Sequence, residues 1–248
     1  MARRVRSFSL LSIVISALCA MVAARMAWQD PRYLLPFFLI AVLSMAPALL
    51  ARRRMRRLLM SGDVQRVLGT WAGSMERVTY PETMAPLMIA TAYASYGWID
   101  AARAALARAA KGPAWEAALE QRLFVETLLD TFEGDREGAM EKARVLEKMP
   151  IPSVGLFTSK RVGRLRRGMT ALARAFAHES NAQDATALLA AGRASPLIHW
   201  AMRYAAAIVL VDQGKSSEVR ALLEGAPEWP KESAFRVFHE ELLAQVSL

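Results

Sequence analysis

The stretch from residue 34 to residue 68 constrains the fold of this chain more than any other, because an apolar run leads directly into a cluster of arginines. Leu34–Ala51 contains 18 successive residues without a charge, and five arginines follow within positions 52–57. A Gly62-Asp63 turn comes soon after, without a flexible linker before it. A helix of about 20 apolar residues spans the hydrocarbon core of a bilayer. We therefore expect a membrane helix that continues into the first helix of a folded domain.

Another uncharged run, the 17 residues of Phe8–Ala24, lies upstream and is separated from the first by a short turn. Two such runs predict a transmembrane helical hairpin within residues 1–51, with spans at about 7–25 and 34–51. The basic start of the upstream run and the small residues near its end also fit a secretory signal. A cleaved signal peptide is therefore the alternative for this run.

The excess positive charge of the chain is confined to its first quarter. Residues 1–60 hold ten arginines against the single acid Asp30, a net charge of +9, whereas the remainder carries 22 basic and 22 acidic side chains. Nucleic-acid binding needs a basic face on the folded domain, so the neutral remainder argues against a nucleic-acid partner. Arginines beside apolar spans mark the cytoplasmic side of a membrane. The excess of arginine over lysine, 26 to 6, is typical of a GC-rich bacterial gene. We expect a two-pass protein of the bacterial inner membrane, with both termini and the folded domain in the cytoplasm.

Turn residues recur after position 60 at spacings of 35, 37, 46 and 34 residues. A small or β-branched residue follows each turn by five positions, and proline follows each of the last four by sixteen. This spacing, together with helix-period apolar residues, predicts a series of helical pairs. The turn residues are Gly62, Gly97, Gly134, Ser180 and Gly214, the small or branched residues are Val67, Ala102, Ala139, Ala185 and Val219, and the prolines are Pro113, Pro150, Pro196 and Pro230.

The pattern resembles the tetratricopeptide repeat, a pair of antiparallel helices of about 34 residues. The clearest unit has Ala90 before the turn at Gly97, Ala102 after it and Pro113 at its end. The tryptophan found early in the family's first helix is missing from every unit, and related helical hairpin repeats are the alternative. The resemblance implies an all-α protein in which an α-solenoid of about five helix pairs occupies residues 52–248.

An insertion at residues 151–168 accounts for the longest spacing, which exceeds the others by about a third of a repeat. The preceding unit is rich in acids. In one interpretation, the acidic unit and the basic insertion neutralise each other across the surface between repeats. In the other, the insertion binds anionic lipid or an acidic partner. The basic residues of the insertion are Lys160, Arg161, Arg164, Arg166 and Arg167.

No motif in the sequence indicates catalysis. His178, His199 and His239 are isolated, without a second ligand at metal-binding spacing. Cys19 is the only cysteine, and neither a phosphate-binding glycine loop nor a nucleophile elbow is found. We expect no enzymatic activity, no cofactor and no metal site.

The resemblance implies that partners bind the concave face formed by the first helix of each pair. The candidate partner-binding residues are Phe124, Leu128, Phe132, Arg167, Arg174, His178, Tyr204 and Ile208. The candidates for contact with anionic lipid or an acidic partner are Arg52, Arg53, Arg54, Arg56, Arg57, Lys160, Arg161 and Arg164. The expected function is a membrane-anchored cytoplasmic scaffold that recruits or assembles protein partners. The alternative is a structural or regulatory subunit of a membrane complex, in which the hairpin itself is the main binding element.

Overall fold

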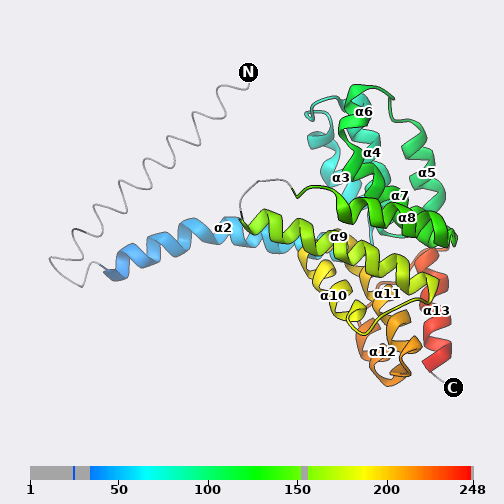
Figure 1. Ribbon diagram of the computed structural model, residues 1–248. Coiled ribbons are helices and arrows are strands. Elements are labelled where there is room, and N and C mark those ends of the chain that lie inside the picture. Colours follow the sequence, from blue (N-terminus) through cyan, green and yellow to red (C-terminus); the bar gives the residue numbers. More distant parts are fainter. Residues whose placement is uncertain (1–24, 26–33, 152–155, 247–248) are drawn as a thin grey trace. The chain divides into compact units, whose positions relative to one another are not determined.

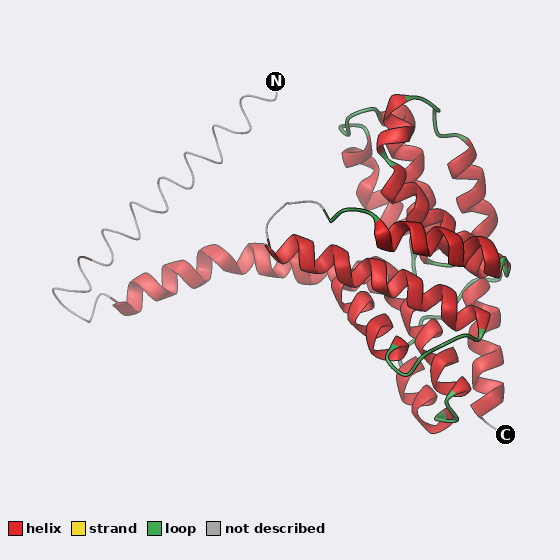
Figure 2. Ribbon diagram, in the orientation of Figure 1, coloured by secondary structure: helices red, strands yellow, loops and turns green. Residues whose placement is uncertain are grey.

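The computed structural model describes residue 25 and the ranges 34–151 and 156–246, and every regular element in these ranges is helical (Figures 1 and 2). The predicted all-α fold is therefore confirmed. The elements are α2 (Leu34–Met60), α3 (Val64–Met75), α4 (Pro81–Ser95), α5 (Ile99–Ala107), α6 (Pro113–Ala117), α7 (Leu119–Glu133), α8 (Arg136–Lys148), α9 (Leu156–Ala177), α10 (Asp184–Ala194), the short 3-10 helix η2 (Pro196–Ile198), α11 (His199–Asp212), α12 (Ser216–Leu223) and α13 (Ala234–Val246).

The chain divides into two compact units, residues 1–55 and 56–248. In the first unit, the described residues beyond position 33 belong to α2, whose side chains from Pro47 to Met55 are exposed. Residues 7–24 of the first predicted span lie outside the described ranges. Within the described ranges, no helix combines the length and the apolar character needed to cross a membrane.

In the second unit, the chain reverses direction at the positions where the sequence has its turn glycines. Gly97 and Gly134 adopt left-handed φ angles of 73° and 86°, and the amide after each donates to a carbonyl in the last turn of the preceding helix. Glycine ends helices in this way because a side chain would strain a left-handed residue. At the Ser180 turn, His178 is the residue with positive φ, 59°. Asparagine, aspartate and histidine tolerate this conformation better than most non-glycine residues.

Successive helical pairs pack against one another in chain order. The pairs α4/α5, α7/α8, α9/α10 and α11/α12 are each joined by one of these turns, and α4, α7, α9, α11 and α13 pack in sequence. The first pair is not formed as predicted, because α3 packs on α4 while Arg52–Arg57 of α2 are exposed. Pro113 also differs from prediction, since it begins α6 rather than directly ending α5.

The segment from Trp229 to Ala234 packs against the turn between α4 and α5 and against Gly62, and closes the unit. The Ala234 amide donates to the Gly97 carbonyl at 2.9 Å, and the Ser233 hydroxyl donates to the Tyr96 carbonyl at 2.7 Å. Trp229 lies against Gly62, where a β-carbon would come within 3.2 Å of its ring. Segments more than 130 residues apart in sequence are thereby joined.

Aromatic side chains fill the space between the first helices of the pairs. Phe132 of α7 has its ring centroid 5.3 Å from that of Phe235, and Phe176 of α9 lies 5.2 Å from Phe238. Tyr204 of α11 lies 5.1 Å from Phe235. Edge-to-face and offset pairs at such distances are favourable beyond their burial of apolar area. We call this cluster the aromatic core; its members are Tyr96, Phe132, Phe176, Trp200, Tyr204, Trp229, Phe235 and Phe238.

The last turn of α2 is fixed to this core. The Tyr96 hydroxyl donates to the Leu59 carbonyl at 2.7 Å, and the Trp200 indole donates to the Met60 carbonyl at 2.8 Å. The last carbonyls of a helix have no partner within the helix, so these two side chains cap it. Burial raises the pKa of the Tyr96 hydroxyl, with a further contribution from Asp63, so the phenol stays protonated and can donate. We call Arg56–Met60 the α2 root.

Candidate functional site

Three of the residues predicted to form a concave binding face are buried inside the unit. Leu128 and Tyr204 are fully buried and Phe132 is 8% exposed. For Phe132 and Tyr204 the cover is α13, whose Phe235 and Phe238 lie against Phe132 and, in the case of Phe235, against Tyr204. None of the three side chains therefore offers a surface to a partner in this structure.

The other apolar candidates are only partly covered. Phe124 is half-buried and packs against the core. Ile208 and His178 line a pocket of about 510 Å³ at the junction of α9, α11 and α13, with Asp212 among the lining residues. The Nδ1 atom of His178 lies 3.0 Å from Oδ1 of Asp212, so this candidate already has a partner within the chain.

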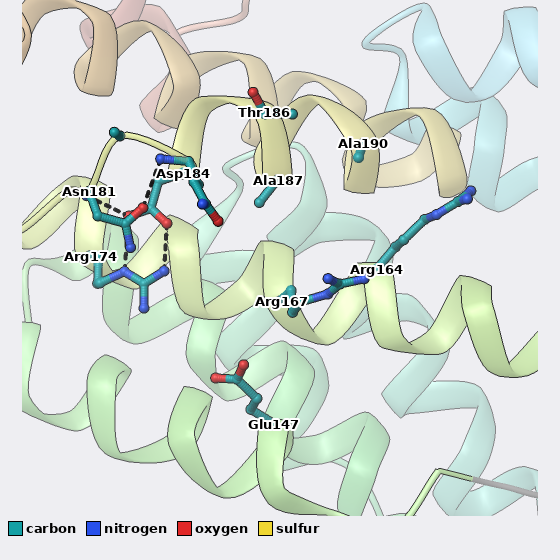
Figure 3. Close-up of a pocket in the computed structure, with 11 residues that line it drawn as sticks. Glu147, Arg164, Arg167, Arg174, Asn181, Asp184, Thr186, Ala187 and Ala190 are labelled. Atoms are coloured by element: carbon teal, nitrogen blue, oxygen red, sulfur yellow. Dashed lines mark hydrogen bonds and ion pairs between the residues drawn. The ribbon is translucent and has the colours of Figure 1, made fainter.

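Three of the basic candidates lie together on a different surface, between α9 and α10. A groove of about 450 Å³ is lined by Arg164, Arg167 and Arg174 on one side and by the first residues of α10 on the other. Figure 3 shows Arg164 and Arg167 on α9 facing the small residues Ala187 and Ala190 of α10. We call this surface the basic groove. It brings together Arg167 and Arg174, which were predicted to bind a protein partner, and Arg164, which was predicted to contact anionic lipid or an acidic partner.

The predicted insertion shapes this groove because much of it is helical rather than looped. From Leu156 onward, the inserted residues form the first half of α9, which therefore runs for 22 residues. Within that half, Arg166 points inward and is buried, donating to Glu120 at 3.0 Å and to the carbonyls of Met149 and Pro150. Arg166 is therefore neutralised by Glu120 of the acidic unit, as the first interpretation of the insertion predicted.

The other basic residues of the insertion lack such partners. Lys160, Arg161, Arg164 and Arg167 are exposed, and among the described residues no carboxylate forms an ion pair with them. Within the preceding acidic unit, Asp130 pairs instead with Arg103 at 2.8 Å and with Lys142 at 2.5 Å. The charges of the insertion are therefore open to an external anion.

Arg174 has a different role at the end of the groove. Its guanidinium donates two hydrogen bonds to Asp184, at 2.9 and 2.5 Å, and Asp184 also accepts from the Asn181 amide at 2.9 Å. Hydrogen bonding to Asp184 raises the pKa of the Arg174 guanidinium more than its partial burial lowers it, and nearby Glu147 adds to the rise. Arg174 is therefore a fixed structural cation that holds the α9–α10 turn in place.

The groove has an excess of positive charge. Asp184 is neutralised by Arg174. Glu147, the remaining acid in the lining, accepts a 2.9 Å hydrogen bond from the Thr170 hydroxyl and keeps its negative charge, so the lining carries a net charge of +1. Arg164 and Arg167 are left with their donors directed to solvent, apart from a weak 3.3 Å contact from Arg167 to the Gly163 carbonyl. Guanidinium groups bind carboxylates and phosphates through paired hydrogen bonds. The small residues of α10 would let a bound segment approach closely.

Sequence reasoning missed the α10 side of the groove and Glu147. Thr186, Ala187 and Ala190 are unremarkable in composition, and only the packing of α10 on α9 makes them part of a surface. Of the lipid candidates in α2, Arg52–Arg57 are exposed along the helix. Across the described ranges, no three metal-ligating side chains come together. Comparison of the chain with protein-family models, with curated proteins and with solved structures finds no match.

Proposed function

We propose that this chain is a membrane-anchored scaffold that binds an acidic segment of a partner protein in the basic groove between α9 and α10. The observation that carries the proposal is the pair of unneutralised arginines, Arg164 and Arg167, beside a wall of small residues. An acidic helix or extended segment could place carboxylates on both guanidinium groups while its backbone rests near Ala187 and Ala190. This proposal replaces the aromatic concave face by the basic groove as the binding surface.

The anchor and the location are part of the same proposal and rest on the sequence. Two uncharged runs separated by a short turn, with arginines at their outer flanks, favour a two-pass anchor with the folded unit on the cytoplasmic side. Leu49 and Leu50, each about half exposed, are apolar side chains left uncovered on the described part of α2. The turn spacing supports a tetratricopeptide-like arrangement of the helical pairs. No motif in the sequence indicates catalysis, so the proposal includes no enzymatic activity.

One observation favours the alternative in which the hairpin is the main binding element. The face that solenoid repeats of this kind use for partners is occupied by α13. In that case residues 56–248 would serve to stabilise the cytoplasmic end of the hairpin within a larger membrane complex.

Co-purification with two matched charge variants tests the proposal. The tagged full chain is isolated from membranes of its native host, and bound proteins are quantified by mass spectrometry. Arg164→Gln/Arg167→Gln should reduce recovery of the specific partner about tenfold, because two charge-assisted contacts are removed. Arg136→Gln/Arg144→Gln on α8 removes the same charge from exposed side chains outside the groove and should leave recovery unchanged.

A pair of truncations distinguishes the two candidates. If residues 59–248 retain the partner and residues 1–58 do not, the scaffold function is supported. Recovery with residues 1–58 alone, together with unchanged recovery by the groove variant, would contradict it in favour of the hairpin.

A further inference from the structure

A second basic pocket lies beside the α2 root and is separate from the basic groove. It has a volume of about 320 Å³ and is lined by Arg193 at the end of α10 and by His199 and Arg203 at the start of α11. Its remaining wall is apolar and includes Leu189, Met202 and Leu222. We call it the root pocket.

Two cations line the root pocket, Arg193 of α10 and Arg203 of α11, and Arg56 of α2 acts on it from outside the lining. Arg193 is exposed, and Arg203 is half-buried with its guanidinium 5.1 Å from the Trp200 ring. Arg56 of the α2 root is close enough for its charge to act on His199. Glu224 is near enough to affect Arg203 but forms no ion pair with it. Among the described residues, Arg193 and Arg203 therefore form no ion pair with a carboxylate, and Glu224 acts on Arg203 only through its charge.

Burial lowers the pKa of two groups in this pocket, and nearby positive charges add to the change in one of them, His199. Burial first, and then the charges of Arg203 and Arg56, lower the pKa of His199 to about 4, although a hydrogen bond to the Gly192 backbone acts in the opposite direction. Burial also lowers the pKa of the Arg203 guanidinium. The imidazole is consequently neutral at physiological pH, and its Nε2 atom lies 3.5 Å from the Arg203 guanidinium. An anion that approached these side chains would stabilise the charged forms of Arg203 and His199.

We propose that the root pocket binds the phosphate group of an anionic phospholipid headgroup. Arginine forks match phosphate oxygens, and the apolar wall suits the part of the lipid next to the headgroup. The membrane source rests on the proposed anchor. Ala51, which ends the apolar run, is five residues before Arg56, and five residues span at most about 18 Å even when extended. A bilayer that held the run would thus bring its headgroups near Arg56, whose charge acts on His199 of this pocket, as cytoplasmic basic clusters beside membrane helices require.

The three histidines of the chain allow a direct test by NMR. The full chain, labelled with 13C at the histidine rings, is titrated with acid in dodecyl maltoside, first alone and then with added phosphatidylglycerol. A bound phosphate next to His199 should raise the pKa of this residue by about one pH unit or more, since an opposite charge favours the protonated form. The signals of His178 and His239 should not respond to the lipid.

Two comparison ligands identify the source of the phosphate. Phosphatidylcholine, whose headgroup has no net charge, and inorganic phosphate at the same concentration should leave the titration of His199 unchanged. An equal response to inorganic phosphate would mean that the pocket takes a free anion and would overturn the lipid assignment. The absence of a response to phosphatidylglycerol would overturn the site altogether.

A pair of double variants links the response to these residues. Arg56→Gln/Arg193→Gln should abolish the lipid-induced change, whereas Arg77→Gln/Arg108→Gln, which removes two exposed arginines elsewhere, should preserve it. The comparison is made between titrations with and without lipid, because loss of Arg56 itself raises the starting pKa of His199. If the chain proves soluble without detergent, the anchor is refuted independently, and the same titration in water still tests the pocket.

Discussion

The aromatic core and the basic groove are built on the same series of helices but differ in what completes them. The aromatic core is completed by the chain itself, because Phe235 and Phe238 of α13 cover Phe132 and Phe176. The basic groove is not completed by the chain, since Arg164 and Arg167 form no ion pair with an acid among the described residues. Apolar surface can be covered by any later helix with apolar residues, whereas an arginine needs a carboxylate at a defined position. The basic groove therefore stays open, whereas on the apolar side of the described part of the chain only the pocket beside Ile208 does.

The largest expected effect comes from removing the ring that closes the aromatic core. Phe235 is fully buried and contacts rings on α7, α11 and the 224–233 segment. Phe235→Ala should lower the free energy of unfolding by about 3–5 kcal/mol, because it leaves a cavity. Urea unfolding of the full chain, monitored by tryptophan fluorescence, measures the change. Val237→Ala, at a position 52% exposed on the same helix, should cost about 0.5 kcal/mol or less. Equal effects would show that α13 does not close the core.

Two adjacent arginines of α9 offer a sharper comparison. Arg166→Met should destabilise the protein by about 2 kcal/mol, because the carbonyls of Met149 and Pro150 lose a buried donor and Glu120 loses its partner. Arg167→Met should leave stability within about 0.5 kcal/mol of wild type, since its side chain is exposed. Thermal unfolding followed by circular dichroism distinguishes the two. A large cost at Arg167 would mean that the basic groove is structural.

Those neighbouring arginines also show how far the sequence can predict this molecule. The turns and the all-α fold follow from local chemistry, since Gly97 and Gly134 are residues that a left-handed helix end requires. The closure of the core does not, because α13 comes after the last recognisable turn and carries no signal of the face it covers. The different roles of Arg166 and Arg167 were equally hidden. Both have the same chemistry, and only the packing of α9 against α7 and α8 determines which one points inward.

The helical pairing beneath both surfaces is tested at Ala102. This residue is fully buried in α5, whereas Ala107 at the end of the same helix is exposed. Ala102→Leu should cost about 1–3 kcal/mol by overpacking the contact between helices, and should lower the melting temperature by several degrees. Ala107→Leu should be nearly neutral in the same measurement. A similar loss at both positions would show that the register of the pair is wrong.

The smallest effect concerns His199, which lines the root pocket. Its pKa of about 4 in the folded state is below the ordinary value of 6.5. Between these two pH values the unfolded chain binds a proton that the folded chain does not, so acidification favours unfolding across this window. At pH 7 both states are neutral at this residue, and the penalty develops as the pH falls from about 6.5 toward 4. Because the imidazole is only half-buried, solvent screening reduces the effect to about 1 kcal/mol.

The variant His199→Gln isolates this contribution. Urea unfolding at pH 7 and at pH 4.5 should show that the wild type loses about 1 kcal/mol more than the variant over this interval. Carboxylate pairs such as Arg174–Asp184 are the same in both proteins, so their acid sensitivity cancels in the difference. Since Arg56 and Arg203 keep their charge at both pH values, the remaining difference reports the burial of the imidazole and the positive field around it. An identical acid response in both proteins would show that neither burial nor the charges of Arg203 and Arg56 lower the pKa of His199 in the folded state.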